Sequence, residues 1–173
     1  MKRFYLAFIF ILSINTAALA EVKIAYIDIE QILKNSKAAN DASEQIQAKL
    51  AEYQAAISAE GKELETKRAE LEKQAAILTK EALVEKQKQL FSKVAAFEKK
   101  IAAQRKALEG SYVKAIAEIE KAVYAIITEQ AEKSNYNLIL DKDNIIYFKD
   151  LDNLTQIVTE VLNQKTPKVK VEF

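Results

Sequence analysis

The 173-residue sequence contains no cysteine, no histidine and no tryptophan, and it has only one proline and two glycines. Without cysteine and histidine it lacks thiolate nucleophiles, imidazole bases, the usual zinc ligands and histidine ligation of haem. So few turn-forming residues leave little room for a sandwich, a many-turned barrel or a doubly wound α/β fold, because these need a turn about every ten residues. We therefore expect a mostly helical protein that uses no metal and no other cofactor.

The first twenty residues have the pattern of a cleaved secretory signal peptide. A positive start at Lys2 and Arg3 precedes an apolar run over 4–14, and Ala18 and Ala20 supply the small residues of a cleavage site. The alternative is a membrane anchor, but the run is well short of the roughly 20 apolar residues that a span needs. We expect cleavage after residue 20 and export of the mature chain.

Charge is unevenly distributed along the mature chain. Residues 21–173 carry 24 basic and 25 acidic side chains, yet the segment 62–106 alone holds 12 basic and 7 acidic ones. The rest of the mature chain is correspondingly acidic. If the middle of the chain forms a separate part of the structure, one end of the molecule should be positive and the other negative.

The middle of the chain, residues 37–134, has the spacing of a coiled coil. It contains no proline, and apolar residues recur at every seventh position, which is the heptad signature. The first arm carries Leu50, Ile57, Leu64, Leu71 and Leu78. The return arm carries Leu90, Val94, Phe97, Ile101 and Leu108 and then, after a four-residue step, Tyr112, Ile116, Ile119, Val123 and Ile126.

A bend near residues 78–80 is expected to turn this stretch into a helical hairpin. Thr79 is a suitable N-cap, and Glu81 would lie in the first turn of the helix that follows. Two arms of about 50 residues would each be about 75 Å long. Equal arms would bring residue 30 back beside residue 134.

The apolar seam of this hairpin becomes thinner toward the bend. The second core position is apolar near the start of the arms, but it is Glu60, Lys67 and Gln74 further out, where alanine is also frequent. Alanine buries little area in each contact. We expect packing to be firm at the base and weak at the tip, with arms that bend and splay, whereas a rigid rod would favour a full two-position seam throughout.

Short strands are expected at both ends of the hairpin. The segments 23–29, 137–142 and 145–149 are rich in β-branched and aromatic residues, and the turn-forming stretch 141–144 favours a β-hairpin between the last two. An amphipathic helix should follow, capped by Asp152 or Thr155, with Leu154, Ile157, Val158, Val161 and Leu162 on one face. These strands and helices would form a body from residues 21–36 and 135–164. The tail, residues 165–173, is expected to be a mobile terminus rather than a strand.

Both faces of the predicted sheet are apolar, which favours self-association. Such a sheet needs cover on each side, and the remaining chain is short. The expected contact residues are Ile24, Tyr26, Ile27, Leu138, Ile139 and Leu140. The alternative is a monomer whose own helical segments cover both faces.

Two motifs and the order of the elements resemble the Skp/OmpH family of periplasmic chaperones. The motifs are Lys23-Ile24-Ala25-Tyr26-Ile27-Asp28 and Asn137-Leu138-Ile139-Leu140-Asp141, the second continuing to Ile146-Tyr147 and a last helix that ends Val161-Leu162-Asn163. The resemblance implies a homotrimer whose strands form a β-barrel body and whose helical hairpins project as tentacles around a cavity. It also implies a periplasmic holdase for unfolded outer-membrane proteins.

The resemblance also directs attention to basic residues of the return arm. Some relatives carry a lipopolysaccharide-binding cluster. The residues of this chain that match it most closely are Lys99, Lys100, Arg105 and Lys106, which we call the basic cluster. It would contact clients, lipopolysaccharide or an anionic membrane surface. The alternative is an ordinary solvated helix face.

Three other functions are compatible with parts of the sequence. A structural spacer or adaptor of the cell envelope could use the same hairpin to bridge fixed partners. An enzyme could use paired carboxylates such as Glu63 and Glu65, or Asp141 and Asp143, but acidic residues with lysine neighbours on helices are usually solvated surface. Nucleic-acid binding is disfavoured by export and by the lack of aromatic residues interleaved with the basic ones.

Overall fold

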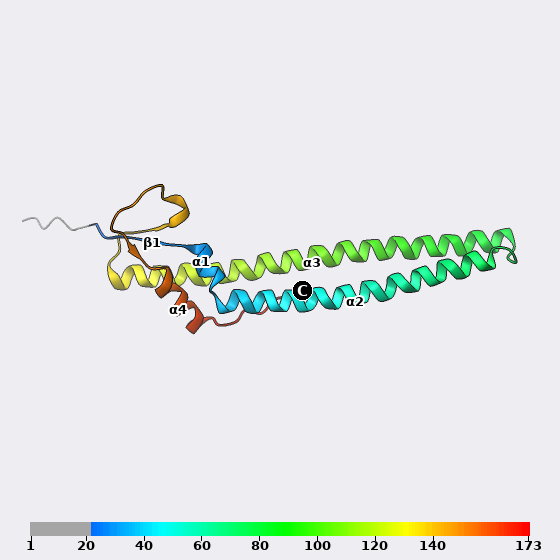
Figure 1. The fold of residues 1–173 in the computed structure, drawn as a ribbon, viewed down its shortest axis with the longest axis horizontal. Coiled ribbons are helices and arrows are strands. Elements are labelled where there is room, and N and C mark those ends of the chain that lie inside the picture. The colour runs from blue at the N-terminus through cyan, green and yellow to red at the C-terminus, as the bar shows by residue number, and fades with distance from the viewer. Residues whose placement is uncertain (1–21) are drawn as a thin grey trace, which may run out of the picture.

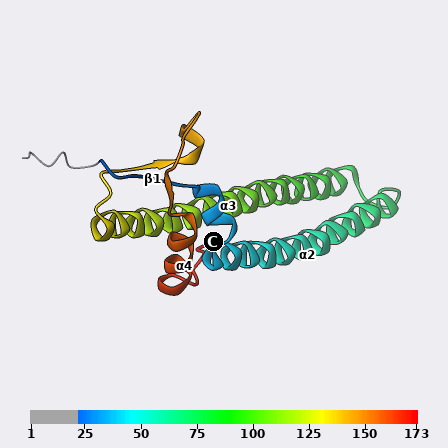
Figure 2. The same ribbon diagram turned by 60° about the vertical axis from the view of Figure 1, so that its left-hand side comes forward.

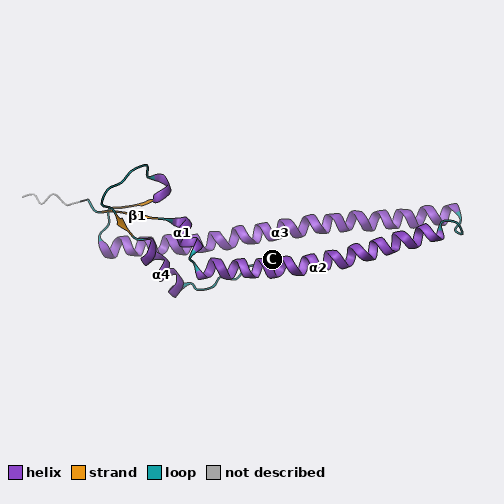
Figure 3. Cartoon of the chain, viewed as in Figure 1, coloured by secondary structure: helices purple, strands orange, loops and turns teal. Residues whose placement is uncertain are grey.

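Two long antiparallel helices dominate the protein, and a small sheet with two short helices lies at one end of them (Figures 1 and 3). The computed structural model describes residues 22–173, so the predicted signal peptide lies outside the described residues. The elements in chain order are β1 (Ile24–Ile27), α1 (Ile29–Lys34), α2 (Lys37–Gln74), α3 (Lys80–Ser134), β2 (Leu138–Asp141), the 3₁₀ turn η1 (Lys142–Asn144), β3 (Asp152–Asn153) and α4 (Thr155–Lys165). A mostly helical protein with a small sheet is therefore confirmed.

The bend of the hairpin lies where the sequence predicts it. Helix α2 ends at Gln74, and the Thr79 side chain accepts a hydrogen bond of 3.3 Å from the backbone N–H of Ala82 at the start of α3. Glu81 lies in the first turn of α3, where its charge favours the helix N-terminus. Thr79 as N-cap and the bend itself are confirmed.

The two arms are not equal, which differs from the prediction. Helix α3 has 55 residues and α2 has 38, because the chain breaks at Asn35 and Ser36 between α1 and α2. The Ser36 side chain caps α2 by accepting a hydrogen bond of 3.3 Å from the N–H of Ala39. The longer α3 therefore extends past the start of α2 and supports the sheet (Figure 1).

The sheet is parallel and has the order β2-β1-β3. Ile24 pairs with Leu138 and Tyr26 with Leu140, and β3 joins the other side of β1. The predicted β-hairpin between 137–142 and 145–149 is wrong. After β2 the chain forms η1, passes through an irregular loop that includes 145–149, and returns on the far side of β1.

The loop explains why this prediction failed. Ile146 and Tyr147 have the composition of a strand but are 105% and 80% exposed. Asp150 has a left-handed backbone with φ of 58°, which redirects the chain into β3. Helix α4 also begins differently from the prediction: Leu154 occupies the N-cap position without a side-chain cap.

Helices α1, α3 and α4 gather on one side of the sheet and form the core with it and with the first turn of α2 (Figure 2). The buried members of this core are Ile27, Ile32, Ala38, Ile119, Val123, Ile126, Val158 and Leu162. On the predicted apolar face of α4, Val158 and Leu162 are buried, and Leu154 and Val161 pack against the core. Ile157 differs, because it is 44% exposed.

Packing in the hairpin is dense only near the sheet. The buried residues of α2 are Ala38 and Ala42, and those of α3 lie between Ser111 and Gln130. From residue 43 to residue 110 no side chain of the described hairpin is fully buried. The predicted contrast in packing between base and tip is therefore confirmed, while bending and splaying of the arms stay a prediction.

The seam of the return arm follows a different phase from the one predicted near residue 112. Tyr112 is 48% exposed, whereas the small residues Ser111 and Ala115 are buried in its place. The reason lies in the tail, whose residues 169–173 pack along the base of the hairpin. Val171 is 6% exposed and forms a small cluster with Ala42 and Ala115. The expectation of a mobile tail is therefore wrong for this structure.

Candidate functional site

The sheet presents one covered face and one outer face. Strand side chains alternate between faces, so Ala25 and Ile27 point toward the helices, while Ile24 and Tyr26 point the other way. The register adds Leu138 and Leu140 beside Ile24 and Tyr26. We call Ile24, Tyr26, Leu138 and Leu140 the outer face.

The six contact residues predicted from the sequence are therefore divided between the two faces. Ile27 is only 4% exposed, and Ile139 packs against the same core, so both belong to the covered face. The outer face keeps the other four. Sequence composition alone could not separate them, because all six are apolar and the pairing of the strands decides which ones lie together.

The outer face is apolar and incompletely covered. Leu138 is 45% exposed, and Phe148 of the loop lies against Tyr26 with 4.6 Å between ring centroids. Strands β2 and β3 form the edges of the sheet, where backbone N–H and C=O groups are free to pair. An apolar face next to an open edge is characteristic of an association surface.

Polar contacts hold the ends of the strands in place. Lys23 and Asn137 exchange two hydrogen bonds of 2.8 Å, one of them through the Asn137 side chain. The Tyr136 hydroxyl donates a 2.6 Å hydrogen bond to the Asp152 carboxylate, and this bond, helped by burial, raises the pKa of Tyr136 to about 12. The order of the sheet is thus secured at the end from which β1 and β2 start.

Asp28 links the sheet to α1 at the opposite end of β1. Its carboxylate accepts 2.8 Å from the N–H of Gln31 and 3.0 Å from the ammonium group of Lys142. These bonds, the backbone one foremost, lower the pKa of Asp28. The same residue therefore caps α1 and holds the end of β2.

The basic cluster lies on α3, but the structure does not bring its four residues onto one face. All four are exposed. The Lys100 ammonium pairs with Glu60 of α2 at 2.6 Å, and Arg105 borders a cavity on another side of the hairpin. Lys99 and Lys106 are seven residues apart and share a third face. The cluster is therefore a band around α3.

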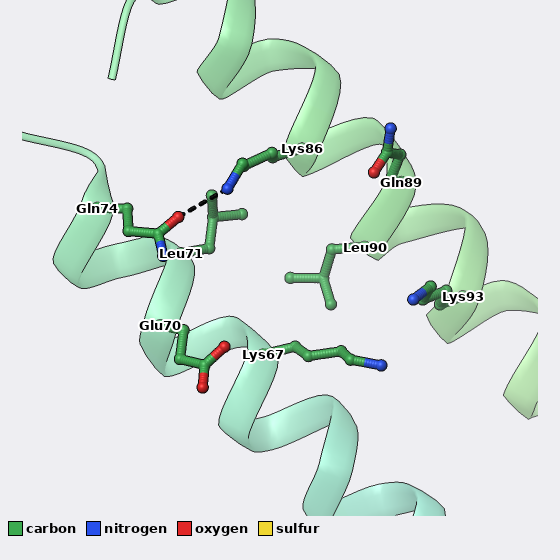
Figure 4. Close-up of a pocket in the computed structure, with 8 residues that line it drawn as sticks. All are labelled: Lys67, Glu70, Leu71, Gln74, Lys86, Gln89, Leu90 and Lys93. Atoms are coloured by element: carbon green, nitrogen blue, oxygen red, sulfur yellow. Dashed lines mark hydrogen bonds between the residues drawn. The ribbon is translucent and has the colours of Figure 1, made fainter. Parts of the chain in front are cut away.

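Three cavities lie between α2 and α3 where the seam is not filled. The cavity near the bend has a volume of about 200 Å³, and in it Leu71 and Leu90 face each other with three lysines around them, Lys67, Lys86 and Lys93 (Figure 4). One of these, Lys86, donates a 2.8 Å hydrogen bond to Gln74.

The other two cavities lie nearer the base. One, of about 510 Å³, is lined by Ala56, Ala59, Glu60, Glu63, Leu64, Lys67, Lys93 and Ala96. The other, of about 330 Å³, is mostly apolar and is lined by Leu50, Tyr53, Gln54, Ile57, Ser58, Ile101, Gln104, Arg105 and Leu108. The apolar parts of these cavities can accept apolar side chains through non-directional contacts.

Among residues 22–173 no group of three acidic side chains is arranged to hold a metal ion. In the same part of the chain, no helix combines the length and the apolar character that crossing a membrane requires.

The family model described as "Outer membrane protein (OmpH-like)" matches residues 23–162, which include every strand and helix up to α4. The chain belongs to the OmpH-like family. The resemblance seen in the sequence is thus confirmed. A search of curated proteins found no match.

A solved structure shares the fold of this OmpH-like protein. It is the crystal structure of a "putative outer membrane chaperone (OmpH-like)" from Caulobacter crescentus, with a TM-score of 0.79 at 14% identity. The alignment covers 86% of this chain and 88% of the other. The similarity therefore extends over the hairpin as well as the sheet.

Sequence reasoning missed the residues of this OmpH-like protein that receive the tail. Gln45 of α2 donates 2.7 Å to the backbone oxygen of Val169 and accepts 3.2 Å from the N–H of Val171. The Ser111 hydroxyl donates to the backbone oxygen of Glu172. The alternation of Val169 and Val171 was the available signal, but nothing local indicated where this segment would dock.

Proposed function

We propose that this protein is a periplasmic holdase chaperone. It would bind unfolded outer-membrane proteins between flexible helical arms and prevent their aggregation before insertion into the outer membrane. The observation that carries the proposal is a long hairpin, unfilled along its outer part, on a chain of the OmpH-like family. This activity requires no catalytic group.

The body would assemble three subunits through the outer face and the open sheet edges. Ile24, Tyr26, Leu138 and Leu140 are the residues in position to meet a second copy, because Ile27 and Ile139 are occupied by the subunit's own core. Pairing at the edge of β2 would satisfy its free backbone groups. A closed ring of copies removes the open edges, as closure into a barrel does.

The arms would supply many weak contacts to the client. Unfolded β-barrel proteins expose apolar sequence and unpaired strand edges, which drive aggregation. The cavities between α2 and α3 and the alanines around them offer shallow apolar contact without a rigid template. The basic cluster would attract acidic stretches of a client, lipopolysaccharide or an anionic membrane surface over about 10 Å at moderate salt.

Aggregation suppression separates the holdase from an envelope spacer. A urea-unfolded outer-membrane β-barrel protein is diluted into buffer with the mature protein, and light scattering follows aggregation. A holdase should suppress the signal at about one trimer per client. Unchanged aggregation, together with co-purification of one folded partner, would favour the spacer.

The outer face is tested by the mass of the assembly. Ile24→Glu with Leu138→Glu should convert trimers into monomers and abolish suppression of aggregation. Val113→Glu, at an exposed position of α3, is the matched control and should leave both unchanged. Multi-angle light scattering measures the mass, and circular dichroism confirms that the variants stay folded. A variant that remains trimeric and active would refute the assignment of the outer face.

A further inference from the structure

The tail lies against one side of α2 at the base of the hairpin. On α2, Ala42, Lys49, Ala56 and Glu63 are spaced seven residues apart and therefore lie on one side of the helix. Ala42 is buried against Val171, and the Lys49 ammonium lies 5.8 Å from the centre of the Phe173 ring. Ala56 and Glu63 line the 510 Å³ cavity further along. The tail and this cavity therefore lie on the same side of α2, and we call this side, from Ala42 to Glu63, the groove.

Recognition of the tail depends on its extended backbone and on alternate side chains. Gln45 binds the C=O of Val169 and the N–H of Val171 with the two atoms of one amide group, as a neighbouring strand would. Val171 is buried in the groove and Val169 is partly buried, while Lys168, Lys170 and Glu172 are exposed. A groove of this kind selects a pattern, because any residue can supply the backbone groups.

The tail carries a short stretch of the alternating pattern that is found in transmembrane β-strands. Strands of outer-membrane barrels alternate apolar and polar residues, and aromatic residues are frequent near their ends. Val169-Lys170-Val171-Glu172-Phe173 has both features. The chain therefore carries, docked on its own hairpin, a segment with the chemistry of the proposed clients.

We propose that this groove is a binding site for extended strand segments of unfolded outer-membrane proteins, and that the tail is an internal competitor for it. The inference rests on the proposed holdase function and identifies where on the hairpin a client segment docks. A client strand displaces residues 167–173, contacts Gln45 and Ala42, and continues toward Ala56. Because the tail is tethered, it competes at a high effective concentration and keeps the groove covered when no client is bound.

A thiol placed in the tail reports whether it is docked. The sequence has no cysteine, so Val171→Cys introduces a single thiol at a buried position. Gln164→Cys, exposed on α4, gives the rate of an accessible thiol, and Ile119→Cys, buried in the core, gives that of a protected one. Labelling by a thiol reagent is followed with and without a urea-unfolded outer-membrane β-barrel protein.

The client should accelerate labelling of the Val171→Cys protein by about tenfold or more and leave the Ile119→Cys protein protected. An unchanged rate for Val171→Cys, measured while the same sample suppresses aggregation, would overturn the inference but leave the holdase function intact. Acceleration of both buried thiols would also overturn it, because the client would then be loosening the whole base. Failure of all variants and of the unmodified protein to suppress aggregation would instead refute the proposed function.

A truncated protein provides an independent measurement if Val171→Cys prevents docking. The chain ending at Thr166 should bind the unfolded client on the order of tenfold more tightly, because binding no longer requires displacement of the tail. A synthetic peptide of residues 166–173 should bind this truncated protein and be displaced by the client, and a peptide with Val169 and Val171 replaced by serine is the control. Equal client affinity with and without the tail, or a bound peptide that the client does not displace, would show that the tail is only a structural latch.

Discussion

The difference in packing between base and tip of the hairpin makes a quantitative prediction. Ile119 is completely buried at the base, whereas Leu71 near the bend is half-buried beside a cavity of about 200 Å³. Replacing a fully buried isoleucine with alanine in a packed core costs about 2–5 kcal/mol. Leu71 loses less contact when truncated, so Leu71→Ala should cost about 1 kcal/mol.

Urea unfolding followed by far-ultraviolet circular dichroism measures this difference at a fixed protein concentration. With a denaturant slope of about 1–3 kcal/mol per molar, Ile119→Ala should lower the midpoint by about 1 M or more, and Leu71→Ala by a few tenths of a molar. Hydrogen exchange should show fast exchange around residues 60–95 in the unmodified protein. A Leu71→Ala midpoint shift equal to that of Ile119→Ala would refute the idea that the tip is weakly packed.

Three further predictions concern ion pairs, capping and the basic cluster. Lys133 and Lys165 lower the pKa of Glu129 to about 2, so its ion pairs stabilise the fold above pH 4.5 and are lost as the pH falls from 4.5 toward 2. Glu129→Gln should therefore reduce the change of the thermal unfolding midpoint with pH in that range, while Glu132→Gln should leave this change as it is. Thr79→Ala removes the cap of α3 and should cost about 1 kcal/mol, with faster hydrogen exchange in the first turn of α3, and unchanged exchange there would contradict the capping role. Replacing the basic cluster with glutamine should weaken client binding at low salt and reduce its salt dependence, compared with Lys114→Gln and Lys121→Gln, and an unaltered salt dependence would remove the cluster from client capture.

Local sequence was sufficient to locate the bend and the helices. Thr79 and Glu81 were recognised because capping depends on neighbouring residues only, and the structure places the cap there. The heptad spacing of the first arm likewise follows from the geometry of a single helix. The OmpH-like assignment depended on short motifs around Tyr26 and Leu140, which the family match covers.

The pairing of the strands could not be read from the sequence in the same way. Residues 145–149 have strand composition, yet their apolar side chains lie in an exposed loop, and β2 pairs with β1 across more than a hundred residues. An apolar composition predicts that a side chain is buried, but it does not indicate whether the side chain packs against its own chain or against another copy. That ambiguity also mixed Ile27 and Ile139 with the residues of the outer face.

The sequence by itself determined the long helices, the position of their turn and the thinning of their seam, because these depend on residues one or two helical turns apart. The tertiary structure decided the parallel sheet, the division of its apolar residues between two faces and the docking of the tail. Each of these depends on residues such as Gln45 and Val171, which are far apart in the chain. Their contact becomes favourable only after the hairpin has brought its two ends together.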